Sequence, residues 1–112
     1  MIDVASMLAG THIPVQKTKH QSTPAGGTYA VWADAAALDG PDMLLAMLRR
    51  HDITISLYES RPDESAERAV EAALDAENVM WSSSEREWAE EEQHYIVTYT
   101  FAFFEKRRIS NG

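Results

Sequence analysis

The most regular alternation of apolar and polar positions lies near the C-terminal end of the chain, in residues 93–104, QHYIVTYTFAFF. Successive side chains of a β-strand leave opposite faces of the sheet, so a period of two predicts a strand. One of its faces carries the side chains of Tyr95, Val97, Tyr99, Phe101 and Phe103. Aromatic and β-branched residues suit a buried pleated surface, and the segment is longer than the usual strand of about 5–6 residues. We therefore predict that this strand is central to a sheet.

A helical period marks residues 61–77, the clearest predicted helix. Its apolar side chains recur at the spacing of a single helix face, namely Ala66, Ala69, Val70, Ala73 and Leu74. Ser60 and Asp63 have the spacing of a capping box, and Pro62 suits the first turn. Because the stripe is mostly alanine, this helix can approach a sheet closely.

Weaker patterns predict the remaining elements. A short helix is expected at residues 2–9, ending near Gly10, and an edge strand at residues 13–20, where Lys17 and Lys19 would discourage unwanted pairing. Further strands are predicted at residues 28–34, 53–58 and 79–88, the last with a bulge near residues 82–84. A turn at residues 89–92 would join that strand to residues 93–104 as a hairpin.

Residues 35–50 leave two alternatives open. Gly40 and Pro41 predict an irregular connection in residues 35–42. Residues 43–50, MLLAMLRR, are strong helix formers, so propensity favours a helix. No loop separates them from the strand at residues 53–58, however, which favours one long extended stretch.

Together these elements predict an α+β fold in a single domain over residues 1–112. Its mostly antiparallel sheet has four to five strands, with the main helix (about 61–77) packed on one face and a short N-terminal helix beside it. The length of 112 residues suits one domain. Residues 105–112 are expected to form a flexible tail.

The charge is strongly acidic and uneven. The net charge is −8, and residues 59–92 hold 12 acidic against three basic side chains. Such a chain is a poor candidate for tight nucleic-acid binding. The chain has no cysteine, no apolar run of the about 18 residues that span a membrane, and no signal-peptide pattern at residue 1. We expect a cytoplasmic origin and no membrane partner.

No catalytic signature is found. The sequence contains no nucleophile motif, phosphate-binding loop or zinc-binding H-E-x-x-H, and its four histidines lack metal-ligand spacing. We therefore predict no enzymatic activity, no cofactor and no metal site. A small enzyme that uses carboxylate catalysis is the least favoured alternative. The default interpretation of the densest acidic segment is a solvated rim, formed by Glu85, Glu87, Glu90, Glu91 and Glu92.

Aromatic and basic side chains near this rim are candidate interface residues. Trp88 adjoins the acidic turn and is expected to be the most exposed of the three tryptophans. Tryptophans at such positions form a core or an oligomer contact more often than a ligand platform. Lys106, Arg107 and Arg108 follow the C-terminal strand. They would form a solubilising end, a weak phosphate contact, or a contact with the acidic rim of a neighbouring copy.

The order of these motifs resembles the small tail components of long-tailed phages and prophages, in the tail terminator and head–tail joining group. The similarity covers about residues 13–104 and rests on Ile13-Pro14-Val15, Ile53–Tyr58, Pro62-Asp63-Glu64 before an acidic helix, Trp81, Trp88, and Gln93–Tyr99. Residues 35–50 depart from the family pattern, which has a polar, aromatic strand there. The resemblance nonetheless favours an extended conformation for residues 43–50.

The resemblance implies a structural protein without catalytic residues. Members form a ring, usually of six copies, that caps the tail tube and offers a surface to the head connector. DNA would pass through this ring without specific contacts, and some glutamates of the acidic rim would face the lumen. The protein would assemble in the host cytoplasm and end in the virion tail. The main alternative is a small, non-enzymatic ligand-binding or regulatory α+β module.

Overall fold

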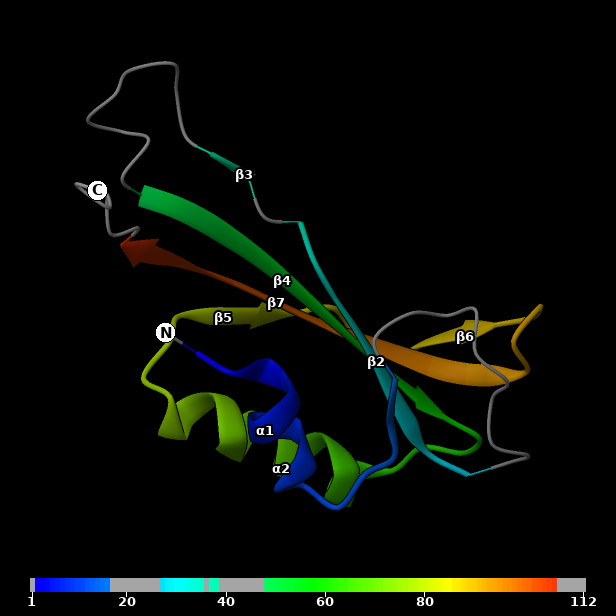
Figure 1. Cartoon of the computed structure of the whole chain (residues 1–112). Coiled ribbons are helices and arrows are strands. Elements are labelled where there is room, and N and C mark those ends of the chain that lie inside the picture. The colour runs from blue at the N-terminus through cyan, green and yellow to red at the C-terminus, as the bar shows by residue number, and fades with distance from the viewer. Residues whose placement is uncertain (1, 17–26, 36, 39–47, 107–112) are drawn as a thin grey trace.

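The computed structural model describes residues 2–16, 27–35, 37–38 and 48–106, and its fold is α+β as predicted (Figure 1). Two helices pack on one face of a mostly antiparallel sheet, whose main strand order is β1-β2-β4-β7-β5. The elements are α1 (Val4–Ala9), β1 (Val15–Gln16), β2 (Tyr29–Asp34), β3 (Ala37–Leu38), β4 (Leu48–Glu59), α2 (Glu64–Ala76), β5 (Trp81–Ser83), β6 (Glu87–Ala89) and β7 (His94–Lys106).

The C-terminal strand is central to the sheet, as its alternation predicts. β7 pairs with β4 at twelve positions, from Leu48 opposite Lys106 to Glu59 opposite Tyr95, and with β5 and β6 on its other side. The prediction of a flexible tail is wrong for Glu105 and Lys106, because pairing with β4 holds their backbone in the ladder. The rest of that predicted tail, residues 107–112, lies outside the described residues.

β4 is longer than the strand predicted at residues 53–58. It begins at Leu48, so the extended alternative is confirmed for residues 48–50, while residues 43–47 lie outside the described part. Pairing with β7 and with the short β3 overrides the helix propensity of this segment. Of the predicted edge strand, residues 15–16 pair with β2 and residues 17–20 are not described.

Helix α2 carries its predicted apolar stripe but begins later than predicted. Its buried side chains are Ala66, Val70 and Leu74. The capping box with Ser60 is wrong: Asp63 is itself the N-cap, and its Oδ1 accepts the N–H of Ala66 at 3.0 Å. Pro62 therefore precedes the helix. The carboxylate of Asp63 accepts an N–H of the first turn that has no partner within the helix, so Ser60 is not needed as a cap.

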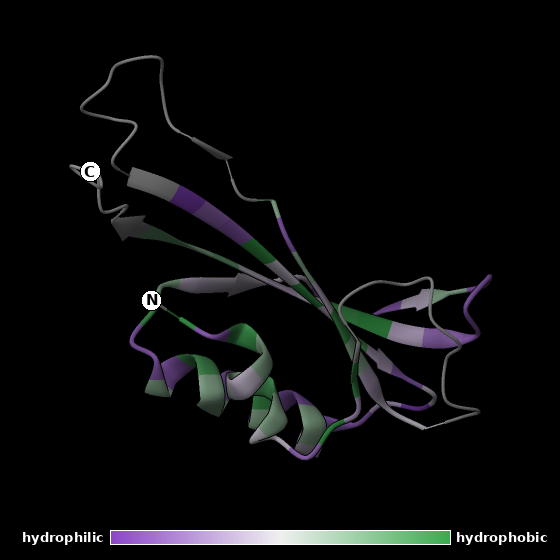
Figure 2. Ribbon diagram, viewed as in Figure 1, coloured by the Kyte–Doolittle hydropathy of each residue, from purple (hydrophilic) through white to green (hydrophobic). Residues whose placement is uncertain are grey.

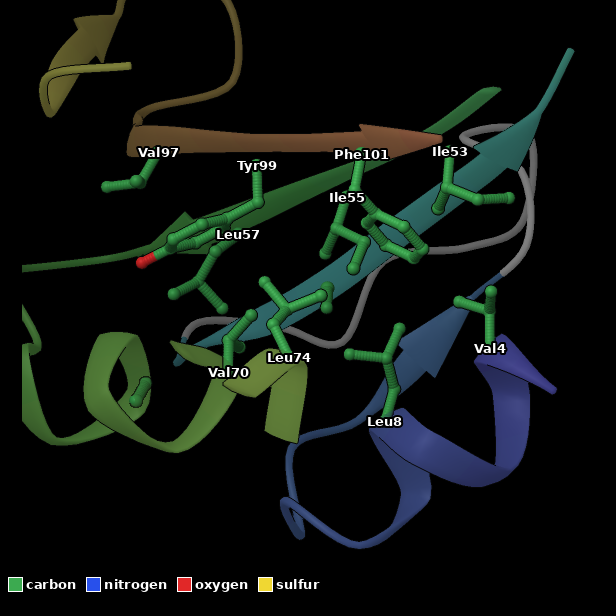
Figure 3. Packing of buried hydrophobic residues seen from close by; sticks show 12 residues of the cluster. Val4, Leu8, Ile53, Ile55, Leu57, Val70, Leu74, Val97, Tyr99 and Phe101 are labelled. Atoms are coloured by element: carbon green, nitrogen blue, oxygen red, sulfur yellow. The ribbon is translucent and has the colours of Figure 1, made fainter. Parts of the chain in front are cut away.

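The hydrophobic core lies between the helices and one face of the sheet (Figure 3). Odd-numbered side chains of β4 and β7 meet apolar residues of α1 and α2 there. The buried set includes Val4, Leu8, Ile53, Ile55, Leu57, Val70, Leu74, Val97, Tyr99 and Phe101. Figure 2 shows the apolar colouring of both helices toward the sheet and polar colouring at the hairpin turn and along part of β4.

The strand predicted at residues 79–88 is two strands separated by a bulge. Ser83 pairs with Tyr99 and Glu87 with Ile96, so four residue steps on this side oppose three on β7. Thr98 donates its N–H to Oγ of Ser84 at 3.0 Å, which replaces a backbone acceptor. The bulge thus follows the predicted site by about two residues. Ala89 pairs with His94, so the turn consists of residues 90–93.

The long strands extend past the helices and form a projecting arm (Figure 1). We define the arm as residues 48–52 of β4 and 102–106 of β7, with β3 paired along the outer side of β4. The part of the sheet that the helices cover is the body (Figure 1). The radius of gyration is 15.9 Å, above the about 13 Å of a compact domain of this length. Neither helix is long and apolar enough to cross a membrane.

Candidate functional site

The glutamates of the predicted acidic rim lie together at one end of the molecule, which we call the acidic end. Glu85 lies in the bulge, Glu87 in β6, and Glu90, Glu91 and Glu92 in the turn before β7. All except Glu92 are exposed, and Glu92 is half-buried. The hairpin therefore gathers these side chains at a solvated tip, where like charges repel one another unless a partner of opposite charge approaches.

Trp88 lies beside the acidic end and is 46% exposed, while Trp32 and Trp81 are half-buried against the core. The prediction that Trp88 is the most exposed tryptophan is confirmed. Its ring meets Tyr95 edge-on at 4.9 Å, and its Nε1–H donates to Oε2 of Glu90 at 2.7 Å. An ordered, partly exposed indole of this kind is typical of protein contact surfaces.

One of the predicted basic residues lies at the opposite end of β7. Lys106 is the last residue of that strand, about 40 Å along the chain from the acidic turn, while Arg107 and Arg108 lie outside the described residues. Arg50 adds an exposed charge to the arm and pairs with Asp52 at 2.9 Å. This contact is an exposed ion pair of small energetic value, so the guanidinium can exchange partners easily.

A histidine–aspartate pair lies where the arm leaves the body. The Nδ1–H of His51 donates to Oδ2 of Asp34 at 2.6 Å, and the imidazole stacks on Phe103 with ring centroids 4.6 Å apart. His51 is buried, and the second oxygen of Asp34 is buried without a hydrogen-bond partner. The burial of His51 could be predicted from the sequence, because His51 lies on the same face of β4 as Ile53 and Ile55.

A buried carboxyl group under the start of α2 is the least expected feature. The side chain of Glu59 is 0% exposed. Arg86 donates to Oε1 of Glu59 at 3.2 Å and to Oε2 of Glu67 at 3.0 and 2.7 Å. Oε2 of Glu59 has no partner. Arg86 reaches this site because it occupies the bulge, which changes the direction of side chains along an edge strand.

Burial raises the pKa of Glu59 to about 8, with a further increase from the neighbouring carboxyl of Glu67. The same two carboxyl groups, Glu67 foremost, raise the pKa of Arg86. Desolvation disfavours a charged carboxylate, whereas the guanidinium favours it, and here desolvation is the larger effect. Nearby, the hydroxyl of Tyr99 donates to Oε2 of Glu71 at 3.0 Å, and burial raises the pKa of Tyr99.

Described residues line two depressions of the surface, and these buried groups contact neither of them. One depression of about 260 Å³ lies at the start of α2, where Thr11, His12, Thr28 and Asp63 line it. The other, of about 340 Å³, lies beside the arm between Arg50, Met80 and Ala102. Glu59 and Tyr99 contact neither. Their raised pKa values therefore come first from burial in this packed polar cluster.

Within the described residues, no group of three or more histidine, aspartate or glutamate side chains has the geometry to hold a metal ion. Neither protein-family models nor curated proteins match this sequence. The functional interpretation therefore depends on the arm, the acidic end and the chemistry that each can perform.

Proposed function

We propose that the protein is a structural subunit of a long-tailed phage or prophage tail. It would form a ring of itself, with six copies as in the family it resembles, and either terminate the tail tube or join tail to head. Its partners would be other copies, the tail-tube protein and the head connector. It would have no enzymatic activity, and it would assemble in the host cytoplasm before it becomes part of the virion tail.

The observation that carries this proposal is the projecting arm. A narrow ribbon buries little apolar surface and is only marginally stable alone. The arm nevertheless presents Phe104, whose side chain is 56% exposed, and Met80 beside it is 95% exposed. Exposure of large apolar side chains to water is energetically unfavourable, and contact with another protein would bury them. An arm of this shape supports an assembly role.

Charge separation supports a head-to-tail arrangement. The acidic end and the arm, where Arg50 is exposed, lie at opposite ends of the subunit. A ring built from one subunit needs two different, complementary surfaces, because each copy contacts its two neighbours through different faces. Opposite charges also increase the rate of encounter and disfavour contacts between like ends.

The lumen hypothesis concerns the acidic end. Glutamates that are exposed and gathered on one tip would repel the phosphate backbone and let DNA pass without binding. We propose that at least part of the acidic end faces the lumen. A ring map with every glutamate of this set on the outer wall would contradict that assignment.

A ligand-binding module is less well supported. None of the three tryptophans lines either of the two depressions described above. A ligand site needs a concave, mostly enclosed surface with a few polar groups directed into it.

Self-association tests the proposed function directly. Sedimentation velocity from low to high micromolar concentration, at low and high salt, measures the assembly state, and negative-stain microscopy shows its shape. We expect a ring-shaped oligomer that forms with rising concentration and weakens with salt. The protein should also bind purified tail tubes at one end. A protein that stays monomeric at every concentration and ignores tail tubes would contradict the proposal.

A further inference from the structure

The two sides of β7 are paired to different extents. Along its whole paired length β7 has β4 on one side. On the other side, the described strands are β6, opposite residues 94–96, and β5, opposite residues 99–101. In Figure 1, β7 continues past the start of β5 toward the arm. Residues 102–106 therefore form a sheet edge without a partner strand among the described residues.

The backbone direction along this edge follows from the bulge. Thr98 donates its N–H to Ser84 and accepts the N–H of Ser84, so its polar groups point toward β5. Successive residues of an antiparallel strand direct these groups to alternate sides. Ala102 and Phe104 consequently direct their N–H and C=O groups to the open edge. Both residues are exposed. The edge is thus a template for an additional strand.

The depression beside the arm lies at this edge. Met80, Ser82, Thr100 and Ala102 are among its lining residues, so it begins where β5 ends. A strand added next to residues 102–104 would continue the line of β5. Alternate side chains of that strand would cover the depression, Met80 and Phe104, which lies on the same face as Ala102, while the other side chains would lie on the helix side of the sheet.

A second exposed strand edge lies at the acidic end. β6 pairs with β7 alone in the described part of the chain, at three positions. Ile96 and His94 are an even number of residues from Thr98, so they direct their N–H and C=O groups toward β6. Glu87 and Ala89 face them and direct their own groups toward β7. Trp88, which lies between Glu87 and Ala89, therefore directs its N–H and C=O away from β7. This edge carries an exposed indole and is surrounded by the glutamates of the acidic end.

We infer that the β6 edge of one copy adds as a strand to the free β7 edge of the arm in the next copy. The inference rests on the proposed self-association and names the surfaces that perform it. Each edge supplies the unpaired backbone groups that the other needs. Trp88 and Phe104 supply apolar contact, and the glutamates meet the exposed Arg50. Because the edges lie at opposite ends of the subunit, the contact is head-to-tail and can close a ring.

Disulfide cross-linking tests this contact cleanly, because the chain has no cysteine. Trp88→Cys would be combined with Ala102→Cys in one variant and with Phe104→Cys in another, because residues that direct their N–H and C=O groups outward face one another in an added antiparallel strand. Under mild oxidation the variant whose register brings the two cysteines face to face should give a ladder of covalent oligomers, since facing residues of paired strands lie within disulfide range. The control combines Ala102→Cys with Ala72→Cys on the exposed side of α2 and should give at most dimers through the arm.

A proline substitution tests the edge without a covalent bond. Ala102→Pro removes an N–H that points to the open edge, so the subunit should fold as the wild type does. Loss of edge pairing should weaken self-association by about tenfold or more, measured by sedimentation. Phe103→Pro is the matched control, because its N–H points toward β4. It should lower the melting temperature of the monomer, which Ala102→Pro should leave nearly unchanged.

The outcomes separate this inference from the proposed function. If the wild type forms rings while neither cysteine pair cross-links and Ala102→Pro assembles normally, the edge contact is wrong and the assembly role is retained. If the wild type never self-associates, with or without tail tubes, both are wrong. A ladder from one of the two strand-edge pairs, together with weak assembly of Ala102→Pro, establishes the contact.

Discussion

The body and the arm share two strands but differ in what stabilises them. In the body, Ile55 and Leu57 of β4 are fully buried by the helices. In the arm, the same strand carries the exposed Arg50, and β7 carries the exposed Phe104. The ladder of backbone pairs is continuous through both regions. The two regions therefore have the same secondary structure and differ in how far their side chains are buried.

This difference assigns separate roles to the two regions. Burial of apolar surface is the dominant favourable term in folding, so the body supplies most of the stability. The arm adds backbone hydrogen bonds, the stack of His51 on Phe103 and the hydrogen bond between His51 and Asp34. It should depend on the body for its conformation, while the body should tolerate changes in the arm. Four substitutions, from the largest expected effect to the smallest, can test this division.

Leu57→Ala should have the largest effect on folding. Leu57 is completely buried between the sheet and α2, and removal of such a side chain leaves a cavity. We expect the free energy of unfolding to fall by about 2–5 kcal/mol. Urea denaturation, followed by circular dichroism, measures the change. A loss below about 1 kcal/mol would show that the helices do not cover the sheet as described.

Arg86→Met should have the next largest effect, because it removes the guanidinium that donates to the buried Glu59 and to Glu67. We expect a loss of about 2–3 kcal/mol at pH 7, below the full cost of breaking a buried pair because Arg86 is partly exposed. Arg68→Met is the matched control. Arg68 pairs with Glu64 at 3.6 Å on the outer face of α2, and its loss should cost at most about 0.5 kcal/mol. Equal losses in the two variants would contradict the buried cluster.

Glu59→Gln should change the pH dependence of stability. A carboxyl group whose pKa rises from 4.5 to about 8 on folding holds its proton in the folded state after the unfolded chain has released it. The wild type should therefore lose stability as the pH rises through this range, by an amount on the order of 2 kcal/mol. Glu59→Gln should remove this loss, seen as a flatter profile of unfolding free energy between pH 5 and pH 9.

The control for that profile is Glu64→Gln. Glu64 lies on the exposed side of α2, so its substitution should leave the pH slope of the wild type unchanged. If Glu59→Gln kept the wild-type slope, ionisation of the buried cluster would not determine the pH dependence.

Phe104→Ala should have the smallest effect on the folded monomer. Its side chain is already mostly in water, so the free energy of unfolding should change by less than about 0.5 kcal/mol. Self-association should nonetheless weaken, because the arm loses its largest apolar contact. Denaturation and sedimentation of the same variant measure both quantities. A large loss of monomer stability with normal assembly would reverse the roles of arm and body.

The main elements could be predicted because their signals are periodic. The alternation of residues 93–104 and the stripe from Ala66 to Leu74 identify a central strand and the helix that covers it. The acidic end was also predictable, since Glu90, Glu91 and Glu92 lie in a turn whose position two strands determine. In both periodic elements, apolar side chains recur at a fixed spacing, and each recurrence supports the same secondary structure.

The buried polar groups could not be predicted in this way. From the sequence alone, Glu59 would be predicted to lie on the surface, because a charged side chain is seldom buried unless it is paired. Its partner, Arg86, lies 27 residues later and reaches it through a bulge that no periodic pattern encodes. The N-cap at Asp63 and the strand start at Leu48 depend on which neighbour supplies hydrogen bonds, and that information is tertiary.

The unbroken register between β4 and β7 also limits how related proteins can vary in length. Loss or gain of one residue in a strand moves every later side chain to the other face. In the arm such a change would exchange the outward-facing Phe104 for an inward-facing neighbour. Lengthening both strands by two residues keeps each face intact and extends the reach by about 7 Å. Arms of homologues should therefore differ in steps of two residues, as adjustments to partners of different size.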